Sequence, residues 1–314
     1  MNLTSLLLVS ALAAPAASEP PPSWAFVAAE QSAPALVMGS ARDGAPPAFF
    51  WRWEAKNDPN VAKDADAFAN IDECKVKDGG RLVLACASNG GAVGVDVPSR
   101  RARWYLKVRG GTAGPHSLDL LPDGRVALAC STGIDALYLF DVSKAPFDPP
   151  RQTCREAMAL PGAHGVVWDA ARASLFVLGY TNIFELAYAP EKLAVSVKRT
   201  WDYSAPARDA WGHDLVPDGA RGYYFTNHAG VWHFDPDRTD PKDAVTPALD
   251  VPNVKSISRD AAKGDLLLIP TEMWWADRLL VMTGGVQRVV GPFPGARFYK
   301  ARWMEEECKA ESVK

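Results

Sequence analysis

Three of the five histidines of the chain recur along the sequence at nearly equal intervals, and three charged residues continue the series. Successive members of the series are 44, 48, 49, 42 and 45 residues apart. The series is Asp72, His116, His164, His213, Lys255 and Lys300. A period of this length is typical of repeat proteins, in which equivalent positions of successive repeats come together. We therefore expect these six side chains to form one ring.

Imidazoles that face inward from neighbouring repeats have the chemistry of a metal site. Neutral ring nitrogens bind Mn, Zn or Fe, and three of them leave a coordination position for water or substrate. Asp72 is then a fourth ligand or a hydrogen-bond partner of a ligand. The predicted metal ligands are His116, His164, His213 and Asp72. The alternative for each histidine is a structural role, with its ring bonded to a backbone carbonyl.

The two lysines of the series argue for an anionic ligand. Lys255 and Lys300 would repel a metal ion, and with Asp72 they give the ring a net formal charge of plus one. Cationic groups in a partly desolvated site attract anions far more strongly than in water. In the alternative interpretation, one lysine only neutralises Asp72.

The elements around the series are short strands. Each member begins or precedes an apolar run, a turn rich in Asp and Gly follows, and a second apolar run starts 10 or 11 residues after the series position. A third run follows in every repeat, whereas fourth runs are weaker. Four strands per repeat without helical periodicity predict an all-β fold, a six-bladed β-propeller, with seven blades as the runner-up.

The last repeat has almost no chain after its first strand, residues 298–303. Residues 35–38 and 49–53, near the N-terminus, read as strands that are outside the other repeats. We expect them to complete the last blade, so that strands from both ends of the chain close the ring and protect its edges.

Loops between second and third strands leave a blade on the face where its first strand starts, so they frame the predicted ring. Indole rings in such loops suit stacking on sugars, although packing between blades is the alternative. Tyr180 is a further candidate for proton transfer beside the three histidines. The predicted substrate-binding residues are Lys255, Lys300, Arg42, His228, Glu272, Trp274 and Trp275.

The remaining sequence limits the location and the class of the protein. Residues 1–18 contain an apolar run followed by small residues, which predicts a cleaved signal peptide, a secreted protein and one domain over residues 19–314. A net charge of −3 without a basic run excludes nucleic acid as a partner, and the apolar run is too short to span a membrane. Nucleotide-binding and serine-hydrolase motifs are absent. We expect a monomer without a nucleotide cofactor.

Several segments carry a resemblance to a known family. Residues 122–125 (PDGR), 168–172 (WDAAR) and 298–303 (FYKARW) resemble an uncharacterised family of secreted six-bladed propellers, over roughly residues 34–303. The architecture is also similar to propeller-type uronate lyases such as oligogalacturonate and ulvan lyases. The first resemblance implies the fold, and the second implies that histidines at the channel mouth cleave uronates.

Three functions fit these observations. The first is a secreted enzyme that cleaves an acidic carbohydrate by β-elimination, with a cation or metal at the carboxylate and His116, His164, His213 or Tyr180 as the base. The second is a propeller that binds a glycan or small anion without catalysis. The third is a metal-dependent hydrolase or lactonase. Fold alone does not decide among them.

Overall fold

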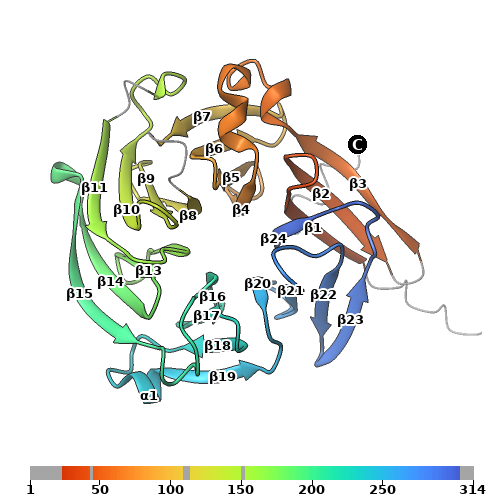
Figure 1. Cartoon of the computed structure of the whole chain (residues 1–314). Helices are drawn as coiled ribbons and strands as arrows, with labels where there is room; N and C mark the ends of the chain where they lie inside the picture. The colour runs from red at the N-terminus through yellow and green to blue at the C-terminus, as the bar shows by residue number, and fades with distance from the viewer. Residues whose placement is uncertain (1–22, 43–44, 109–113, 150–152, 305–314) are drawn as a thin grey trace, which may run out of the picture.

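The computed structural model describes residues 23–42, 45–108, 114–149 and 153–304. The predicted signal peptide lies outside the described residues, so secretion stays a prediction. Six four-stranded antiparallel sheets stand around one central axis (Figure 1). The predicted six-bladed β-propeller is therefore confirmed, and the seven-bladed alternative is wrong.

Five blades are continuous segments of the chain, each with its strands in sequence order from the axis outward. They are β4 (Ile71–Lys77), β5 (Leu82–Ala87), β6 (Gly91–Asp96) and β7 (Arg101–Lys107); β8 (Pro115–Leu120), β9 (Val126–Cys130), β10 (Ala136–Asp141) and β11 (Thr153–Ala159); β12 (Gly165–Asp169), β13 (Ser174–Leu178), β14 (Asn182–Ala189) and β15 (Ala194–Asp202); β16 (Asp214–Pro217), β17 (Tyr223–Thr226), β18 (Val231–Phe234) and β19 (Val245–Leu249); and β20 (Val254–Arg259), β21 (Leu266–Pro270), β22 (Leu279–Thr283) and β23 (Val286–Val290).

The sixth blade joins the two ends of the chain. Its order is β24 (Phe298–Trp303), β1 (Ser23–Glu30), β2 (Ala35–Arg42) and β3 (Ala45–Trp53), from the axis outward. The predicted closure is confirmed, but β1 is an additional strand that sequence analysis missed. Because β1 takes the second place in the blade, β2 is the third strand and not the second.

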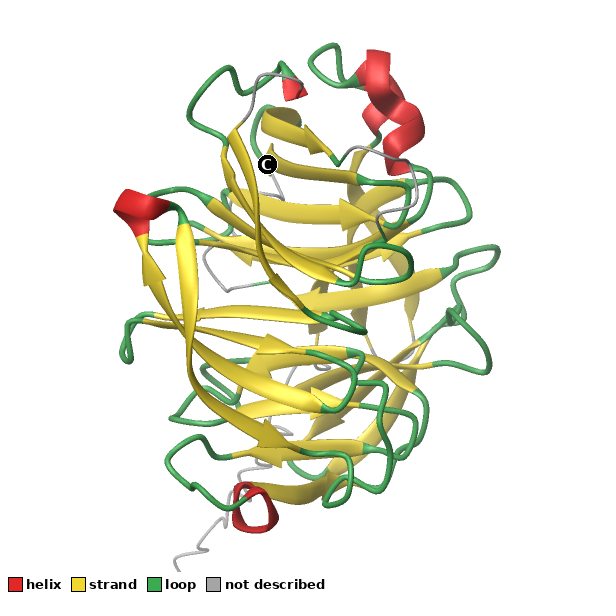
Figure 2. Cartoon of the chain, turned by 60° about the vertical axis from the view of Figure 1, so that its left-hand side comes forward, coloured by secondary structure: helices red, strands yellow, loops and turns green. Residues whose placement is uncertain are grey.

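In the described residues, helices are short segments in the connections between strands (Figure 2). These are the 3-10 helices η1 (Ala55–Asn57), η2 (Ala62–Phe68) and η4 (Pro190–Lys192) and the α-helix α1 (Pro241–Ala244). In the part of the chain that the structure describes, no helix is long and apolar enough to cross a membrane.

The burial of each strand follows from its place in the blade. All residues of the second strands β5, β9 and β13 are buried, which explains their continuous apolar sequences. The outer strands β15 and β23 have mostly exposed or half-buried residues. The core therefore lies between the faces of neighbouring blades, as sheet-on-sheet packing requires.

The six inner strands stand side by side around the axis, since each packs against the inner strands of the two neighbouring blades. Side chains of one inner strand accept hydrogen bonds from the backbone of the next. Asp214 bonds Ile257 N at 2.9 Å, and Ser256 bonds Ala301 N at 3.0 Å. These contacts satisfy N–H groups that an inner strand, as the edge of its blade, leaves unpaired.

Candidate functional site

The inner strands all begin at the same end of the central channel, which we call the upper mouth. Three imidazole rings follow one another here, with centroids 4.3 Å apart for His116 and His164 and 5.8 Å apart for His164 and His213. Tyr299 lies 6.2 Å from His116, although β24 and β8 belong to blades that are not adjacent. The upper mouth is therefore narrow. Its six residues are Asp72, His116, His164, His213, Lys255 and Tyr299.

Local irregularities of the strands direct these side chains. The pairing of β4 with β5 shifts register around Asp72, that of β8 with β9 around His116, and that of β20 with β21 around Lys255. Such a bulge redirects the side chain of the extra residue. His164 and His213 reach the same level directly before β12 and β16. Five of the six predicted ring members therefore meet.

Lys300 is the predicted ring member that the structure places elsewhere. Ser256 bonds Ala301 N, just as Asp214 bonds Ile257 N, so Ala301 is the equivalent of Ile257 and Tyr299 the equivalent of Lys255. Spacing misidentified the position by one residue, because the intervals between the other members vary from 42 to 49 residues and do not fix a single position. Lys300 is fully buried one level deeper, so it is unavailable to a ligand at the upper mouth.

Arg42, predicted to lie beside the ring, is also placed elsewhere by the structure. It ends β2, where it pairs with Ser23 and Ala45, at the end of the blade opposite the upper mouth. Gln31 holds the equivalent loop position instead, since it follows β1 and its amide donates to Asp72 Oδ1 at 2.8 Å. The additional strand β1 moves every loop of this blade by one place, which explains why the sequence pointed to Arg42.

Backbone carbonyls fix the tautomers of two histidines. His116 Nδ1 lies 2.6 Å from Gly114 O, and His164 Nδ1 lies 2.9 Å from Gly162 O. A carbonyl only accepts hydrogen bonds, so Nδ1 carries the hydrogen and Nε2 keeps its lone pair. Burial is the main cause that lowers the pKa of both rings, that of His164 well below its ordinary value. Both are neutral near pH 7, with an Nε2 able to accept a proton or bind a cation.

Lys255 is a buried cation beside the third histidine. Its Nζ lies 3.2 Å from His213 Nε2, 5.2 Å from the ring centre of Trp274 and 5.9 Å from that of Tyr299. Among the described residues, no carboxylate forms an ion pair with it. Burial, followed by the charge of Lys300, lowers the pKa of Lys255 to about 8. Burial, followed by the charge of Lys255, lowers the pKa of His213 to about 2.

Asp72, the remaining charged residue of the upper mouth, is occupied by other donors. One oxygen accepts from Gln31, and the other accepts from the backbone N–H of Ser88 at 2.6 Å and from its hydroxyl. Burial raises the pKa of Asp72 despite the opposing effect of His116. Because Lys300 does not belong to the ring, the net formal charge of the ring is zero and not plus one. The positive charge of the ring lies on Lys255. The negative charge lies on Asp72, whose carboxylate is bonded by Ser88.

Exposed aromatic side chains surround the buried histidines, and we call Tyr180, Trp211, Trp274 and Trp275 the aromatic rim. Tyr180 and Trp211 contact each other edge to face at 4.6 Å between ring centres. Trp274 is 55% exposed although it faces Lys255, and Trp275 stacks against the guanidinium of Arg297. Sequence analysis missed Trp211, whose place two residues before His213 was the available signal.

Two predicted ligand-binding residues lie in the loops of the same face. The ring of His228 lies 4.6 Å from that of His213, and its Nδ1 is 3.4 Å from Asp209 Oδ2. Glu272 is exposed next to the two tryptophans of the aromatic rim.

Below the upper mouth, four charged side chains close the channel, and we call them the ion cluster: Glu73, Asp214, Lys300 and Arg302. Arg302 bonds Glu73 at 2.6 Å and Asp214 at 2.7 Å, and Lys300 contacts the same two carboxylates at 3.2 and 3.3 Å. Burial favours neutral groups, yet the two cations hold the pKa of Glu73 well below its usual range. Two negative and two positive charges therefore balance inside the channel.

The predicted metal site is incomplete in this geometry. In residues that the structure describes, no group of three or more His, Cys, Asp or Glu side chains is arranged to hold a metal ion. Asp72 is bonded by Gln31 and Ser88, and His213 contacts the ammonium of Lys255. Only His116 and His164 offer an Nε2 with a fixed tautomer.

Comparison with protein families gives a match over almost the whole chain. Residues 14–314 match the model of a family described as "Family of unknown function (DUF6528)". The chain belongs to this family. The family description states no activity, and a search of curated proteins finds no match.

Solved structures resemble the family member in fold. A chain of a nidogen/laminin complex has a TM-score of 0.61 and 10% identity, covering 90% of this chain and 100% of that one. A protein from Lactobacillus plantarum has a TM-score of 0.55 and 15% identity, with 87% and 82% covered. A catalytically inactive histidine-to-alanine variant of virginiamycin B lyase from Staphylococcus aureus, with quinupristin, has a TM-score of 0.51 and 9% identity, with 90% and 88% covered. At these identities, the likeness shows the fold alone.

Proposed function

We propose that the upper mouth binds the carboxylate of an acidic saccharide and that the protein cleaves this saccharide by β-elimination. The observation that supports the proposal most strongly is Lys255, a cation that is 3% exposed and has no carboxylate partner among the described residues. The charge of Asp72 acts on Lys255 without forming an ion pair. A buried charge that lacks an ion-pair partner is costly, so an anion that reaches it gains a strong interaction. The aromatic rim adds faces on which sugar rings stack.

The reaction requires a clamp for the carboxylate and a base for the adjacent proton. In β-elimination the base breaks the C–H bond next to the carboxylate, and its electron pair forms a carbon–carbon double bond. The bond from the neighbouring carbon to the glycosidic oxygen breaks, and that oxygen takes up a proton. Lys255 neutralises the carboxylate and thereby acidifies the C–H bond. His164 is the candidate base, because its Nε2 is free and its ring adjoins that of His213.

The remaining predicted residues have supporting roles in this proposal. His116 lies against His164, which suits it to pass a proton on. Tyr180 and His228 stand at the exposed side of the mouth, where they would contact sugar hydroxyls or the leaving oxygen. The virginiamycin B lyase variant supports the idea that a propeller carries lyase chemistry dependent on one histidine.

A propeller that binds the same saccharide without cleaving it is the second candidate. The lowered pKa values of His116, His164 and His213 favour it, because a weaker base removes a proton from carbon less readily. Both candidates use Lys255 in the same way, and only product formation separates them.

A divalent ion, Mn, Zn or Fe, remains a prediction for this site. The Nε2 atoms of His116 and His164 are the nitrogens that would bind it. Elemental analysis of the purified protein, beside a His116→Gln/His164→Gln variant, tests it. A stoichiometric metal that the variant lacks would support the metal-assisted reaction.

The experiment is titration calorimetry with oligogalacturonate and oligoguluronate, each beside a neutral oligogalactose, followed by ultraviolet detection of the unsaturated product. We expect Lys255→Met to weaken binding of the acidic oligomer about 30-fold or more, since one partner of a buried charge pair is removed. Lys144→Met is the matched control, because the side chain of Lys144 is 72% exposed.

Binding without an unsaturated product would support the second candidate. If neither acidic oligomer binds, or if Lys255→Met binds as tightly as the natural protein, the carboxylate clamp is wrong.

A further inference from the structure

The opposite end of the channel, which we call the lower mouth, contains a separate cavity of about 450 Å³. The inner strands end here, below the ion cluster, so the cavity is separated from the upper mouth by four charged side chains. Its volume lies in the range of small-molecule sites. Nothing in the proposed function uses this cavity.

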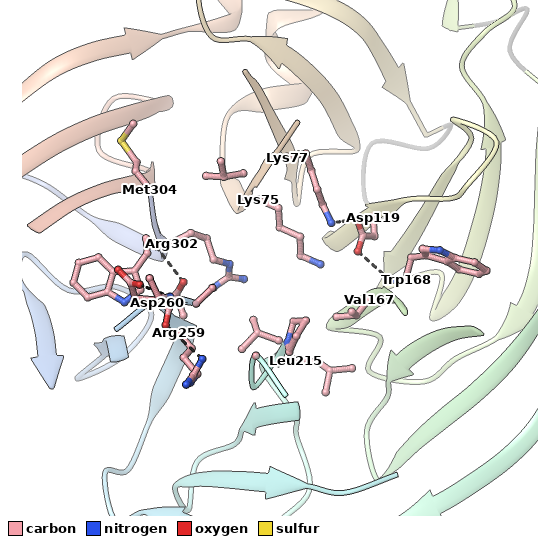
Figure 3. Close-up of a pocket in the computed structure, with 18 residues that line it drawn as sticks. Lys75, Lys77, Asp119, Val167, Trp168, Leu215, Arg259, Asp260, Arg302 and Met304 are labelled. Atoms are coloured by element: carbon pink, nitrogen blue, oxygen red, sulfur yellow. Dashed lines mark hydrogen bonds and ion pairs between the residues drawn. The ribbon is translucent and has the colours of Figure 1, made fainter. Parts of the chain in front are cut away.

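Apolar side chains form much of the wall. Val167 and Val216 from β12 and β16, with Trp168 and Met304, line the cavity. Two cations, Lys75 and Arg302, reach toward its centre from β4 and β24, as Figure 3 shows. Lys77, Arg259, Asp119 and Asp260 also line the cavity, so cations outnumber carboxylates four to two. The cavity therefore combines an apolar surface with an excess of positive charge.

The positive charge of Lys75 has no carboxylate partner in the described part of the chain. Its ammonium donates to the backbone carbonyl of Val166, and its residue is only 8% exposed. The nearby carboxylate of Asp119 is paired with Lys77 at 2.6 Å. Burial lowers the pKa of Lys75 although Asp119 opposes this effect. An anion in the cavity would meet a desolvated cation that is not already neutralised.

Arg302 is the second cation at the wall of the cavity. Its terminal nitrogens bond Glu73 and Asp214, but its Nε is buried and has no hydrogen-bond partner among the described residues. Arg302 is 6% exposed and lines the cavity. The Nε atom is itself enclosed by protein, so it does not open onto the cavity. Arg302 therefore contributes positive charge to the wall, and Lys75 is the cation that a ligand can reach.

We propose that the lower mouth is a second ligand site, for an organic acid that joins one carboxylate to an apolar body. The carboxylate faces Lys75, on the side of the cavity that Arg302 lines, and the apolar part lies against Val167, Val216 and Trp168. The ligand differs from that of the upper mouth, where polar histidines and an exposed aromatic rim suit a saccharide. The second site does not depend on the proposed function.

The test is titration calorimetry of the whole protein with phenylpropionate. Phenylpropionamide has the same body without the charge, and acetate has the charge without the body. We expect phenylpropionate to bind with one-to-one stoichiometry and both analogues to bind about 10-fold more weakly or worse. Lys75→Met should weaken phenylpropionate binding by a similar factor, whereas Lys255→Met should leave it unchanged.

A second variant makes the test independent of Lys75. Ala261 lines the cavity from an exposed turn after β20, so Ala261→Trp should fold and obstruct the cavity. The proposal is overturned if phenylpropionate fails to bind, if the amide binds equally well, or if neither Lys75→Met nor Ala261→Trp weakens binding. A loss caused by Lys255→Met alone would assign the ligand to the upper mouth instead.

Discussion

The ion cluster and the upper mouth occupy successive levels of the same inner strands, and both contain buried charged groups. In the ion cluster, Glu73 and Asp214 share Lys300 and Arg302, so each charge has an opposite charge within hydrogen-bond distance. In the upper mouth, the contacts of Lys255 with described residues are to a neutral histidine and two aromatic rings. Balanced charges suit a structural role, whereas an unbalanced charge suits a ligand. The comparison predicts opposite responses to substitution and to pH.

The largest expected effect is at the ion cluster. Arg302→Met leaves two buried carboxylates with only Lys300 between them, and breaking a buried ion pair in this way costs about 3–5 kcal/mol. The free energy of unfolding in urea measures the loss. Arg103→Met is the control, since Arg103 pairs with Asp96 at a half-exposed site where the loss should stay under about 1 kcal/mol.

The same measurement on Lys255→Met tests the other side of the comparison. Lys255 forms no ion pair with a described residue, so we expect no loss of stability. If Lys255→Met destabilises the fold as much as Arg302→Met does, the contrast between a structural cluster and a ligand site is wrong.

The fold was easier to predict from the sequence than the side chains that form the site, and strand β24 shows why. Turn residues and apolar runs recur in every blade, so six repeats and their closure could be counted. Side-chain direction depends on single-residue register, which repeat intervals of 42 to 49 residues do not fix. The repeat interval selected Lys300 as the ring member, whereas the structure places Tyr299 at the upper mouth. The alternation of apolar and charged residues along β24 was the missed signal. Ala301, like the equivalent Ile257 of β20, and Trp303 are apolar, so the alternating residues Lys300 and Arg302 are left to face the channel.

The loops of the sixth blade were missed for a related reason. Strand β1 contains several alanines and few of the branched residues that mark strands, so the sequence did not reveal it. Without β1, Arg42 was assigned to the upper mouth and Gln31 was overlooked.

Acid should affect the upper mouth before it affects the ion cluster. The pKa of His213 is lowered from 6.5 to about 2 in the folded chain, so below pH 6.5 the unfolded chain binds a proton that the folded chain does not. Stability is therefore lost as the pH falls. Between about pH 6.5 and 5, the natural protein should lose about 1.7 kcal/mol in total relative to His213→Gln. Glu73, whose pKa is lowered from 4.5, adds its loss only at lower pH.

Urea unfolding curves at several pH values measure this difference. A constant difference between the natural protein and His213→Gln over that range would mean that His213 keeps an ordinary pKa when folded. The buried, neutral imidazole of the proposed site would then be wrong.

The smallest expected effect is the alkaline response of Lys255. Its pKa is lowered from 10.5 to about 8, so above pH 8 the folded chain releases a proton that the unfolded chain still holds. Stability then rises with pH, by about 1 kcal/mol between about pH 8 and 9 in the natural protein relative to Lys255→Met. Lys300, whose pKa is raised by Asp214 and Glu73 against the effect of burial, contributes equally to both proteins and cancels in the comparison. Parallel curves for the two proteins would show that a counter-ion accompanies Lys255, and the upper mouth would then resemble the ion cluster.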